Sequence, residues 1–167
     1  MNLSNLELNL CCNSFGKKGT KSLLSPLSNL LNLSKLTLNL DRNKIGEKGV
    51  ESLLSPLGNL LNLSTLFLDL TYNKIGDIGV YSLFYPLSNI MSLSCVSLML
   101  IGNSKKKLTD HLWEHYFKKL KLLKSTDWIY ICSSTTTKIK KKTRNLNQTI
   151  QLLFSYYHIP SQAKRAY

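Results

Sequence analysis

The sequence lacks the short motifs that mark the common classes of enzyme and metal-binding protein. It contains no glycine-rich phosphate loop, no dinucleotide-binding fingerprint, no G-x-S-x-G nucleophile motif and no protein-kinase motif. Its four cysteines form no C-x-x-C pair, which argues against a zinc site and against a disulfide framework. We therefore expect a non-catalytic protein with no metal and no cofactor.

The N-terminus lacks the features of a secretory signal. The first ten residues have no basic stretch, and they contain Glu7. Cysteines without a disulfide pattern are typical of an intracellular protein. We therefore expect a cytoplasmic location, with the nucleus as the alternative.

Charge is missing from one long stretch, residues 78–104, and three lysines follow it directly. Its hydropathy makes residues 83–101 a weak candidate for a membrane span. Pro86 and Asn89 interrupt this segment, and it stays in phase with a repeat that begins at residue 1. We therefore do not expect the chain to cross a membrane.

Leucine and asparagine are abundant, with 35 and 15 of the 167 residues. Residues 1–103 carry 8 Lys or Arg against 6 Asp or Glu, a net charge of +2, whereas residues 104–167 carry 14 against 3, a net charge of +11. All eight glycines lie at or before Gly102. The composition predicts a repeat region over 1–103 and a basic C-terminal region over 104–167.

The chain aligns with itself, without gaps, at a period of 30 residues. Residues 1–30 and 31–60 agree at 19 of 30 positions, residues 31–60 and 61–90 agree at 18 of 30, and a partial copy covers 91–103. A fixed period of this length indicates stacked supersecondary units.

Each copy contains a strand pattern followed by a helix pattern. Leu36, Leu38 and Leu40 alternate with polar residues and belong to one face of a strand. Val50, Leu53, Leu54 and Leu57 follow the i, i+3, i+4, i+7 spacing of a helix. We expect the prolines in phase with this pattern to end or kink the helices, because proline removes a helical N–H. These prolines are Pro26, Pro56 and Pro86.

An asparagine recurs between the strand and the helix, at Asn13, Asn43, Asn73 and Asn103. An amide at this point can bond backbone groups of its own turn and of the neighbouring copy. Glycines follow it in pairs, and they favour a tight turn with positive φ and a close approach of neighbouring coils. These pairs are Gly16 and Gly19, Gly46 and Gly49, and Gly76 and Gly79. The pattern predicts a structural ladder of asparagines.

One strand and one short helix cannot bury a core alone, but stacked copies can. We expect about 3.5 repeats that form an α/β solenoid, with a parallel sheet inside and short helices outside. Since the first copy opens directly on its strand, an exposed sheet edge is expected at the N-terminus. We expect that the chain is a segment of a longer repeat protein or that it pairs through that end.

The pattern L-x-x-L-x-L-x-L-x-x-N-x-I-G-x-x-G-V, read from Leu33 to Val50, resembles the ribonuclease-inhibitor-like class of leucine-rich repeats. Its strand is two residues longer, through Asn39 and Leu40, as in a variant frequent in proteins of single-celled eukaryotes. The resemblance implies a right-handed solenoid, a segment of a horseshoe, that serves as a protein–protein interaction scaffold. It also implies a place in a larger signalling protein, in some cases linked to a kinase, with regulation of a small GTPase as the weaker alternative.

The resemblance implies that a partner binds the concave strand face. Glu7 and Asp69 outnumber Lys35 on this face, which favours a basic partner. Phe67 and Met99 are the expected apolar anchors. The residues predicted to form the face are Asn5, Glu7, Asn9, Lys35, Thr37, Asn39, Thr65, Phe67, Asp69, Cys95, Ser97 and Met99.

The basic region leaves the repeat. We expect it to be mainly helical, with a helical cap over 108–123, a short strand over 128–132, a second helix over 146–157 and a partly disordered tail. The basic run from Lys138 to Arg144 favours a solvated loop, with a nuclear-import signal or a nucleic-acid contact as the alternative.

One motif in this region is typical of zinc peptidases. His111, Glu114 and His115 match H-x-x-E-H, which places two histidines on one helix face. A hydrolytic zinc site needs a third protein ligand, and no glutamate follows Glu114. We therefore expect an ordinary amphipathic helix here and no zinc hydrolysis.

Overall fold

The computed structural model describes residues 3–83, 86–87, 89–103, 128–132 and 137–141. Its elements alternate between strand and helix over the first 103 residues, as the repeat predicts. The order is β1 (Asn5–Asn9), α1 (Gly16–Leu24), a 3₁₀ helix (Ser25–Asn29), β2 (Lys35–Asn39), α2 (Gly46–Leu57), β3 (Thr65–Asp69), α3 (Gly76–Ser82), β4 (Cys95–Met99), β5 (Trp128–Cys132) and β6 (Thr137–Lys141).

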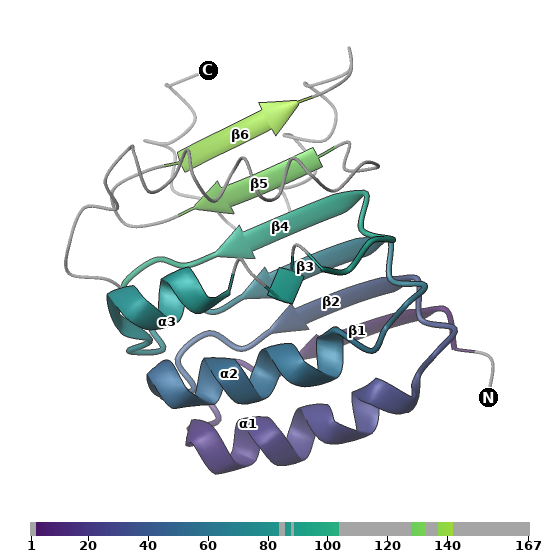
Figure 1. The fold of residues 1–167 in the computed structure, drawn as a ribbon. Coiled ribbons are helices and arrows are strands. Elements are labelled where there is room, and N and C mark those ends of the chain that lie inside the picture. Colours follow the sequence, from purple (N-terminus) through teal and green to yellow (C-terminus); the bar gives the residue numbers. More distant parts are fainter. Residues whose placement is uncertain (1–2, 84–85, 88, 104–127, 133–136, 142–167) are drawn as a thin grey trace.

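The strands form one sheet in chain order, β1 to β6 (Figure 1). Strands β1 to β4 pair in parallel, and each residue pairs with the residue 30 positions later. Leu6, for example, pairs with Leu36, and Leu36 pairs with Leu66. The period of the sequence is therefore the register of the sheet, and the prediction of a parallel sheet in the repeat region is confirmed.

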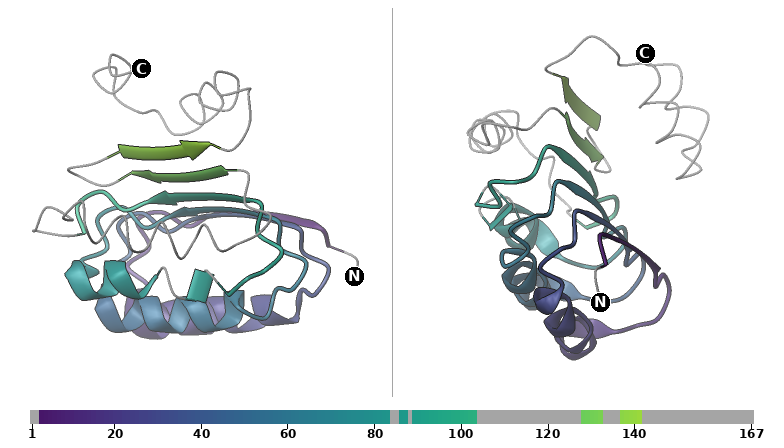
Figure 2. Two further views of the ribbon diagram at one scale, coloured as in Figure 1. Left: turned by 45° about the horizontal axis from the view of Figure 1, so that its top comes forward. Right: turned by 90° about the vertical axis from the view of Figure 1, so that its right-hand side faces the viewer.

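The helices cover one face of the sheet, and the leucines fill the space between the two layers (Figure 2). Leu36, Leu66, Leu53 and Leu83 are fully buried. Since successive strand residues point to opposite faces, the alternating leucines all reach this layer. The described repeats thus form an α/β fold with a single leucine core.

The prolines lie in the last turn of a helix or after its end, and the expectation that they end the helix is not met at Pro56. After α1 the chain continues as a 3₁₀ helix that has Pro26 near its start. In α2 the proline is accommodated inside the helix, at Pro56 in the last turn. Helix α3 ends at Ser82, before Pro86.

Two glycine positions of each copy have different tasks. Gly46 has a φ of +69°, a left-handed conformation that strains any residue with a Cβ, and it begins α2. A Cβ on Gly49 would lie 3.4 Å from the Cα of Lys17 in α1. It would lie only 2.5 Å from the Cγ2 of Ile45, the residue before α2, so Gly49 mainly leaves room for that side chain.

Beyond the repeats the sheet gains two strands. The strand expected over 128–132 is confirmed as β5, which pairs in parallel with β4, while β6 pairs antiparallel with β5. The solvated loop expected from Lys138 to Arg144 is wrong for Lys138–Lys141, because these residues belong to β6. Ile139 lies between Lys138 and Lys140, and pairing with β5 satisfies backbone groups of that segment.

The other predictions for the basic region concern residues outside the described part of the chain. They are the helices over 108–123 and 146–157 and the zinc-peptidase motif at His111, Glu114 and His115. Among the described residues, no helix is long and apolar enough to cross a membrane.

Candidate protein-interaction face

A column of asparagine amides joins each coil to the next at the carboxyl end of the sheet. In the interior, the Oδ1 of Asn73 accepts hydrogen bonds from the backbone N–H of Asn43 at 2.9 Å and of Ile45 at 3.3 Å. Its Nδ2 donates to the carbonyl oxygens of Leu40 at 2.7 Å and Thr71 at 3.1 Å. One buried side chain thus satisfies two donors and two acceptors of two consecutive coils.

The same bonds recur one coil earlier and one coil later. Asn43 accepts from the N–H of Asn13 and donates to Leu10, and Asn103 accepts from Asn73 and donates to Leu70. Asn43 and Asn73 are fully buried, whereas Asn13 is exposed at the first coil. The column fixes the turns that follow the strands and so holds the strand ends in place.

The last residue of each of the strands β1 to β3 accepts a hydrogen bond from the backbone of the turn that follows. The Oδ1 of Asp69 accepts from the N–H of Thr71 at 2.9 Å, and the Oδ1 of Asn39 accepts from Asp41 at 3.0 Å. Asn9 makes the same bond to Cys11 at 3.3 Å. The sequence predicted these three residues as partner contacts, but the structure gives their oxygens a local task in the turn.

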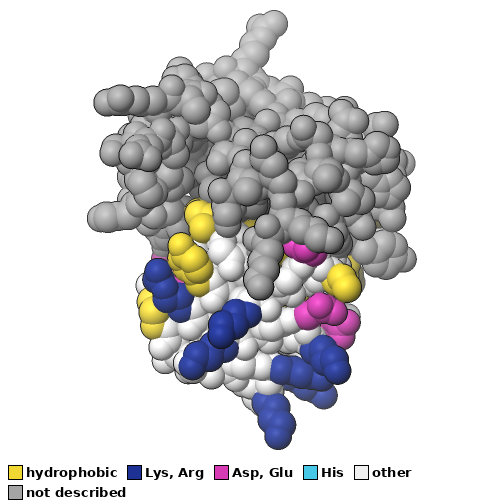
Figure 3. Space-filling model, turned by 90° about the vertical axis from the view of Figure 1, so that its left-hand side faces the viewer, with side chains coloured by type: hydrophobic (Ala, Val, Ile, Leu, Met, Phe, Trp, Pro, Cys, Tyr) yellow, Lys and Arg dark blue, Asp and Glu magenta, His cyan; other side chains and the backbone are white. Residues whose placement is uncertain are grey.

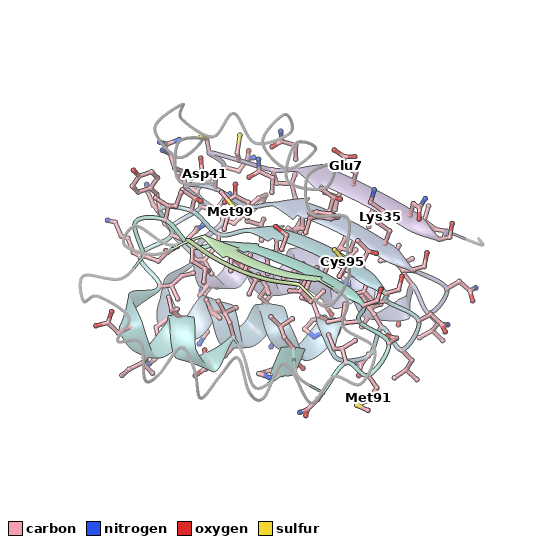
Figure 4. All side chains as sticks on the ribbon, turned by 90° about the horizontal axis from the view of Figure 1, so that it is seen from above. Glu7, Lys35, Asp41, Met91, Cys95 and Met99 are labelled. Carbon is pink, nitrogen blue, oxygen red and sulfur yellow. The ribbon has the colours of Figure 1, made fainter. Side chains whose placement is uncertain are left out.

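The sheet face that points away from the helices is here called the open face. It carries the twelve predicted contact residues in rows set by the strand register, so that Glu7, Thr37, Phe67 and Ser97 form one row across four strands. Figure 4 shows Glu7 and Lys35 on this side of the sheet, opposite the helices.

Accessibility falls along the open face from β1 to β4. Asn5, Glu7, Asn9 and Lys35 are exposed, and the half-buried residues are Asn39, Thr65, Phe67 and Cys95. Four predicted contacts are buried: Thr37 and Asp69 at 8%, Ser97 at 2% and Met99 at 5% exposed. Met99 is therefore buried in the structure, and the accessible part of the face lies mainly on β1 to β3.

The alternation of the sequence could not predict this gradient of accessibility. It predicts which face of the sheet a side chain lies on, but not how much of that side chain is exposed to solvent. The burial depends on what stands beside each row. Thr37, for example, lies in register between Glu7 and the large ring of Phe67. Small side chains between larger neighbours lose their access to water.

On the open face, the exposed side chain of Lys35 lies over the aromatic ring of Phe67. The Nζ of Lys35 is 5.8 Å from the ring centroid of Phe67, within the range of a cation–π interaction. The ring of Phe67 is half-buried and keeps an accessible portion. Glu7, Lys35 and Phe67 together offer an acid, a base and an apolar surface on three adjacent strands.

Burial raises the pKa of the Asp69 carboxyl above its usual value. Hydrogen bonds from Thr71 lower this pKa, and the nearby charges of Asp41 and Arg42 act in opposite directions. Because Asp69 is buried, Glu7 is the acid on the described part of the open face that is freely accessible. The acidic character predicted for the face is therefore concentrated on β1.

Arg42, in the turn after β2, was missed by the sequence analysis. Its guanidinium donates to Asp41 at 2.9 Å and stacks 4.9 Å from the ring centroid of Tyr72. Both partners occupy turn positions that vary between copies, at 11 and 12, 41 and 42, and 71 and 72. The variation at these positions was the available sign that they have a role other than stacking, because the positions that stack the coils are similar in each copy.

These turns belong to an edge that carries most of the charge. Figure 3 looks onto this edge and shows basic and acidic side chains across it. It is here called the charged edge, and its exposed bases are Lys17, Lys18, Arg42, Lys44, Lys48 and Lys74. Within the described ranges, no group of three His, Cys, Asp or Glu residues could hold a metal ion.

Comparison with protein families supports the interpretation of the repeat. The family model described as Leucine Rich repeat matches residues 32–54 and 66–84. These segments run through β2 and α2, and through β3 and α3, of the structure. A search of curated proteins finds no match for this chain. The second and third coils thus contain segments that are similar to leucine-rich repeats.

Proposed function

We propose that this chain is a non-catalytic scaffold that binds a protein partner on the accessible part of the open face. One observation carries the proposal: Glu7, Lys35 and Phe67 present complementary chemistry side by side on strands that buried amides hold in register. A rigid platform loses little conformational freedom when a partner binds, and this favours affinity.

The partner proposed here has a basic group for Glu7 and an apolar side chain for Phe67. Glu7 is exposed at the outermost strand, where salt screens its charge, so it contributes more to partner choice and association rate than to affinity. Phe67 is half-buried near the middle of the accessible rows, which is the position typical of an energetic anchor.

The test is binding by the full chain and by two matched variants. Phe67→Ala removes the proposed anchor, and Ile78→Ala removes an exposed apolar side chain on α3, which covers the other face of the sheet. We expect partners captured by the unchanged chain to bind Phe67→Ala at least tenfold more weakly and Ile78→Ala equally well. Equal affinity of Phe67→Ala for every captured partner would contradict the proposal.

Nucleic-acid binding through the basic run at Lys138–Arg144 is the alternative. It is supported by the net charge of +11 over residues 104–167 and by the extended conformation of Thr137–Lys141. Binding of this kind weakens steeply as salt rises, because phosphate contacts release counterions. Titration with a mixed-sequence RNA at two salt concentrations therefore separates it from the scaffold, whose main anchor is apolar.

A further inference from the structure

The edge opposite the charged edge has an unusual surface. Three exposed apolar side chains recur there in phase: Leu31 is 57%, Leu61 76% and Met91 63% exposed. Each stands four residues before its strand, at the turn between the helix layer and the sheet. These three residues are here called the ridge.

The ridge is continuous from one coil to the next. The side chain of Asn62 donates to the carbonyl oxygen of Leu31 at 2.7 Å, and the N–H of Ser64 donates to the oxygen of Ser34 at 2.9 Å. Consecutive turns are therefore in direct contact. In Figure 4, Met91 lies at one end of the strands and Asp41 at the other, which separates the ridge from the charged turns.

The segments around the ridge contain no charged residue. They are residues 22–34, 52–68 and 78–103, and the polar residues beside the ridge are asparagine and serine. The ridge position is leucine in two copies and methionine in the third, whereas the turn positions of the charged edge differ in chemical class between copies. Exposed apolar residues in a contiguous group, with a neutral polar rim, indicate a contact surface.

We propose that the ridge inserts into the interface of a neutral lipid bilayer, with the amino-terminal ends of the strands toward the membrane and the charged edge toward water. Insertion of this kind is peripheral and differs from a membrane span. It requires no charged group of the ridge segments to leave water, and a charge is the costliest group to bring into lipid. The proposal is independent of partner binding on the open face.

Size and charge favour a lipid surface over a second copy of the chain. A stable protein interface engages about 20–30 residues a side, far more than three protruding side chains. The chain also carries a formal net charge of +13, which opposes self-association. A fluid interface needs no shape-matched groove, and interfacial binding scales with the apolar area that is buried, so a row of leucine and methionine favours weak binding.

The experiment uses the full chain and vesicles of pure phosphatidylcholine in a flotation assay. We expect the unchanged chain to bind, the variant Leu31→Ser/Leu61→Ser to bind at least tenfold more weakly, and the matched variant Ile78→Ser to bind equally well. Ile78 is 67% exposed on α3 and outside the ridge, so it controls for general loss of apolar surface. Thermal unfolding of each variant verifies that it is folded.

A second measurement keeps the test valid if the double variant folds poorly. Leu61→Trp should show a blue shift of its added fluorescence with neutral vesicles, and Ile78→Trp should not. Absence of binding to neutral vesicles, equal binding by the double variant, or binding that requires phosphatidylserine and disappears in high salt would each overturn the proposal. A dimer that the ridge substitutions dissociate, measured by sedimentation, would overturn it in favour of a second copy.

Discussion

The first coil and the interior coils of this protein share their sequence but not their burial. Residues 1–30 and 31–60 agree at 19 of 30 positions, yet Leu6 and Leu8 of β1 are only partly buried, while Leu36 and Leu38 of β2 are at most 1% exposed. The interior coil has a neighbour on each side, whereas among the described residues β1 has one on a single side. The contribution of a side chain to the stability of the protein thus depends on its contacts with the adjacent coils. The first two copies therefore form a matched pair for experiments.

The largest difference between the coils is expected at the asparagine column. Asn73→Ala leaves the buried N–H groups of Asn43 and Ile45 and the buried carbonyl of Leu40 without this partner, and each costs about 1–3 kcal/mol. We expect the free energy of unfolding to fall by roughly 4 kcal/mol or more. Asn13→Ala should lower it by less than about 1 kcal/mol, because water can reach the exposed groups there.

Denaturant unfolding followed by circular dichroism measures both variants. Asn73→Asp is a useful control, since it keeps the accepting oxygen and replaces the donating amide group with a second oxygen. Similar losses for Asn13→Ala and Asn73→Ala would contradict the view that the adjacent coil makes the ladder strong.

The next difference is expected in the leucine core. Leu66→Ala removes a fully buried side chain and leaves a cavity, which lowers the free energy of unfolding by about 2–5 kcal/mol. Leu6→Ala, at the same position of the first coil, should cost about 1 kcal/mol because Leu6 is only partly buried. Thermal melting of the two variants side by side checks the ratio, and equal shifts would show that the first coil is as well packed as the interior.

The first glycine of each helix should contribute about equally to stability in the first and second coils, because both glycines have a left-handed backbone. Gly16 and Gly46 have φ values of +58° and +69°, and the nearest atom to an added Cβ is 3.9 Å away at Gly16, with none within 4 Å at Gly46. Gly16→Ala and Gly46→Ala should therefore each cost roughly 1–2 kcal/mol, because the left-handed conformation itself is strained. Chemical denaturation measures both, and a much larger loss at Gly46 would show that packing contributes there.

The smallest effect concerns pH. Burial raises the pKa of Asp69, so the folded state holds this proton more tightly than the unfolded state. Its contribution to stability is therefore present at acidic pH below the unfolded value and is lost as pH rises through the folded pKa. Asn39 occupies the same position in the preceding coil and makes the same turn bond without a charge.

Asp69→Asn should consequently be at least as stable as the unchanged protein at neutral pH and should show a weaker decline of stability between acidic and neutral pH. Unfolding measured at several pH values tests this expectation. A loss of stability at neutral pH would mean that the Asp69 charge is stabilised by its neighbours rather than penalised by burial.

Most of the repeat region could be predicted from the sequence, because one period fixes strand, turn, helix and register together. The alternation at Leu36, Leu38 and Leu40 places the core, and the phase of Asn43 and Asn73 places the bonds between coils. The accessibility of the open face could not be predicted in this way. Met99 and Phe67 have the same expected orientation, and their different exposure depends on neighbouring rows that periodicity does not describe.

The basic region shows the same limit more strongly. Composition alone favoured a solvated loop at Lys138–Lys141, yet these residues pair with β5. Lysine has a low intrinsic preference for strands, so the sequence of this segment does not by itself favour an extended conformation. Its pairing with β5, which lies outside the repeat, stabilises that conformation.

By itself the sequence determined the period, and through it the strand register, the leucine layer and the column of amides, because similar copies repeat the same hydrogen bonds between neighbouring coils. Only the tertiary structure decided which chemically similar residues face water. In the structure Leu6 is partly buried, Asp69 is buried and Leu61 is exposed. Solvent access depends on the neighbours of a residue in space, and these neighbours lie 30 positions away in the sequence or outside the repeat.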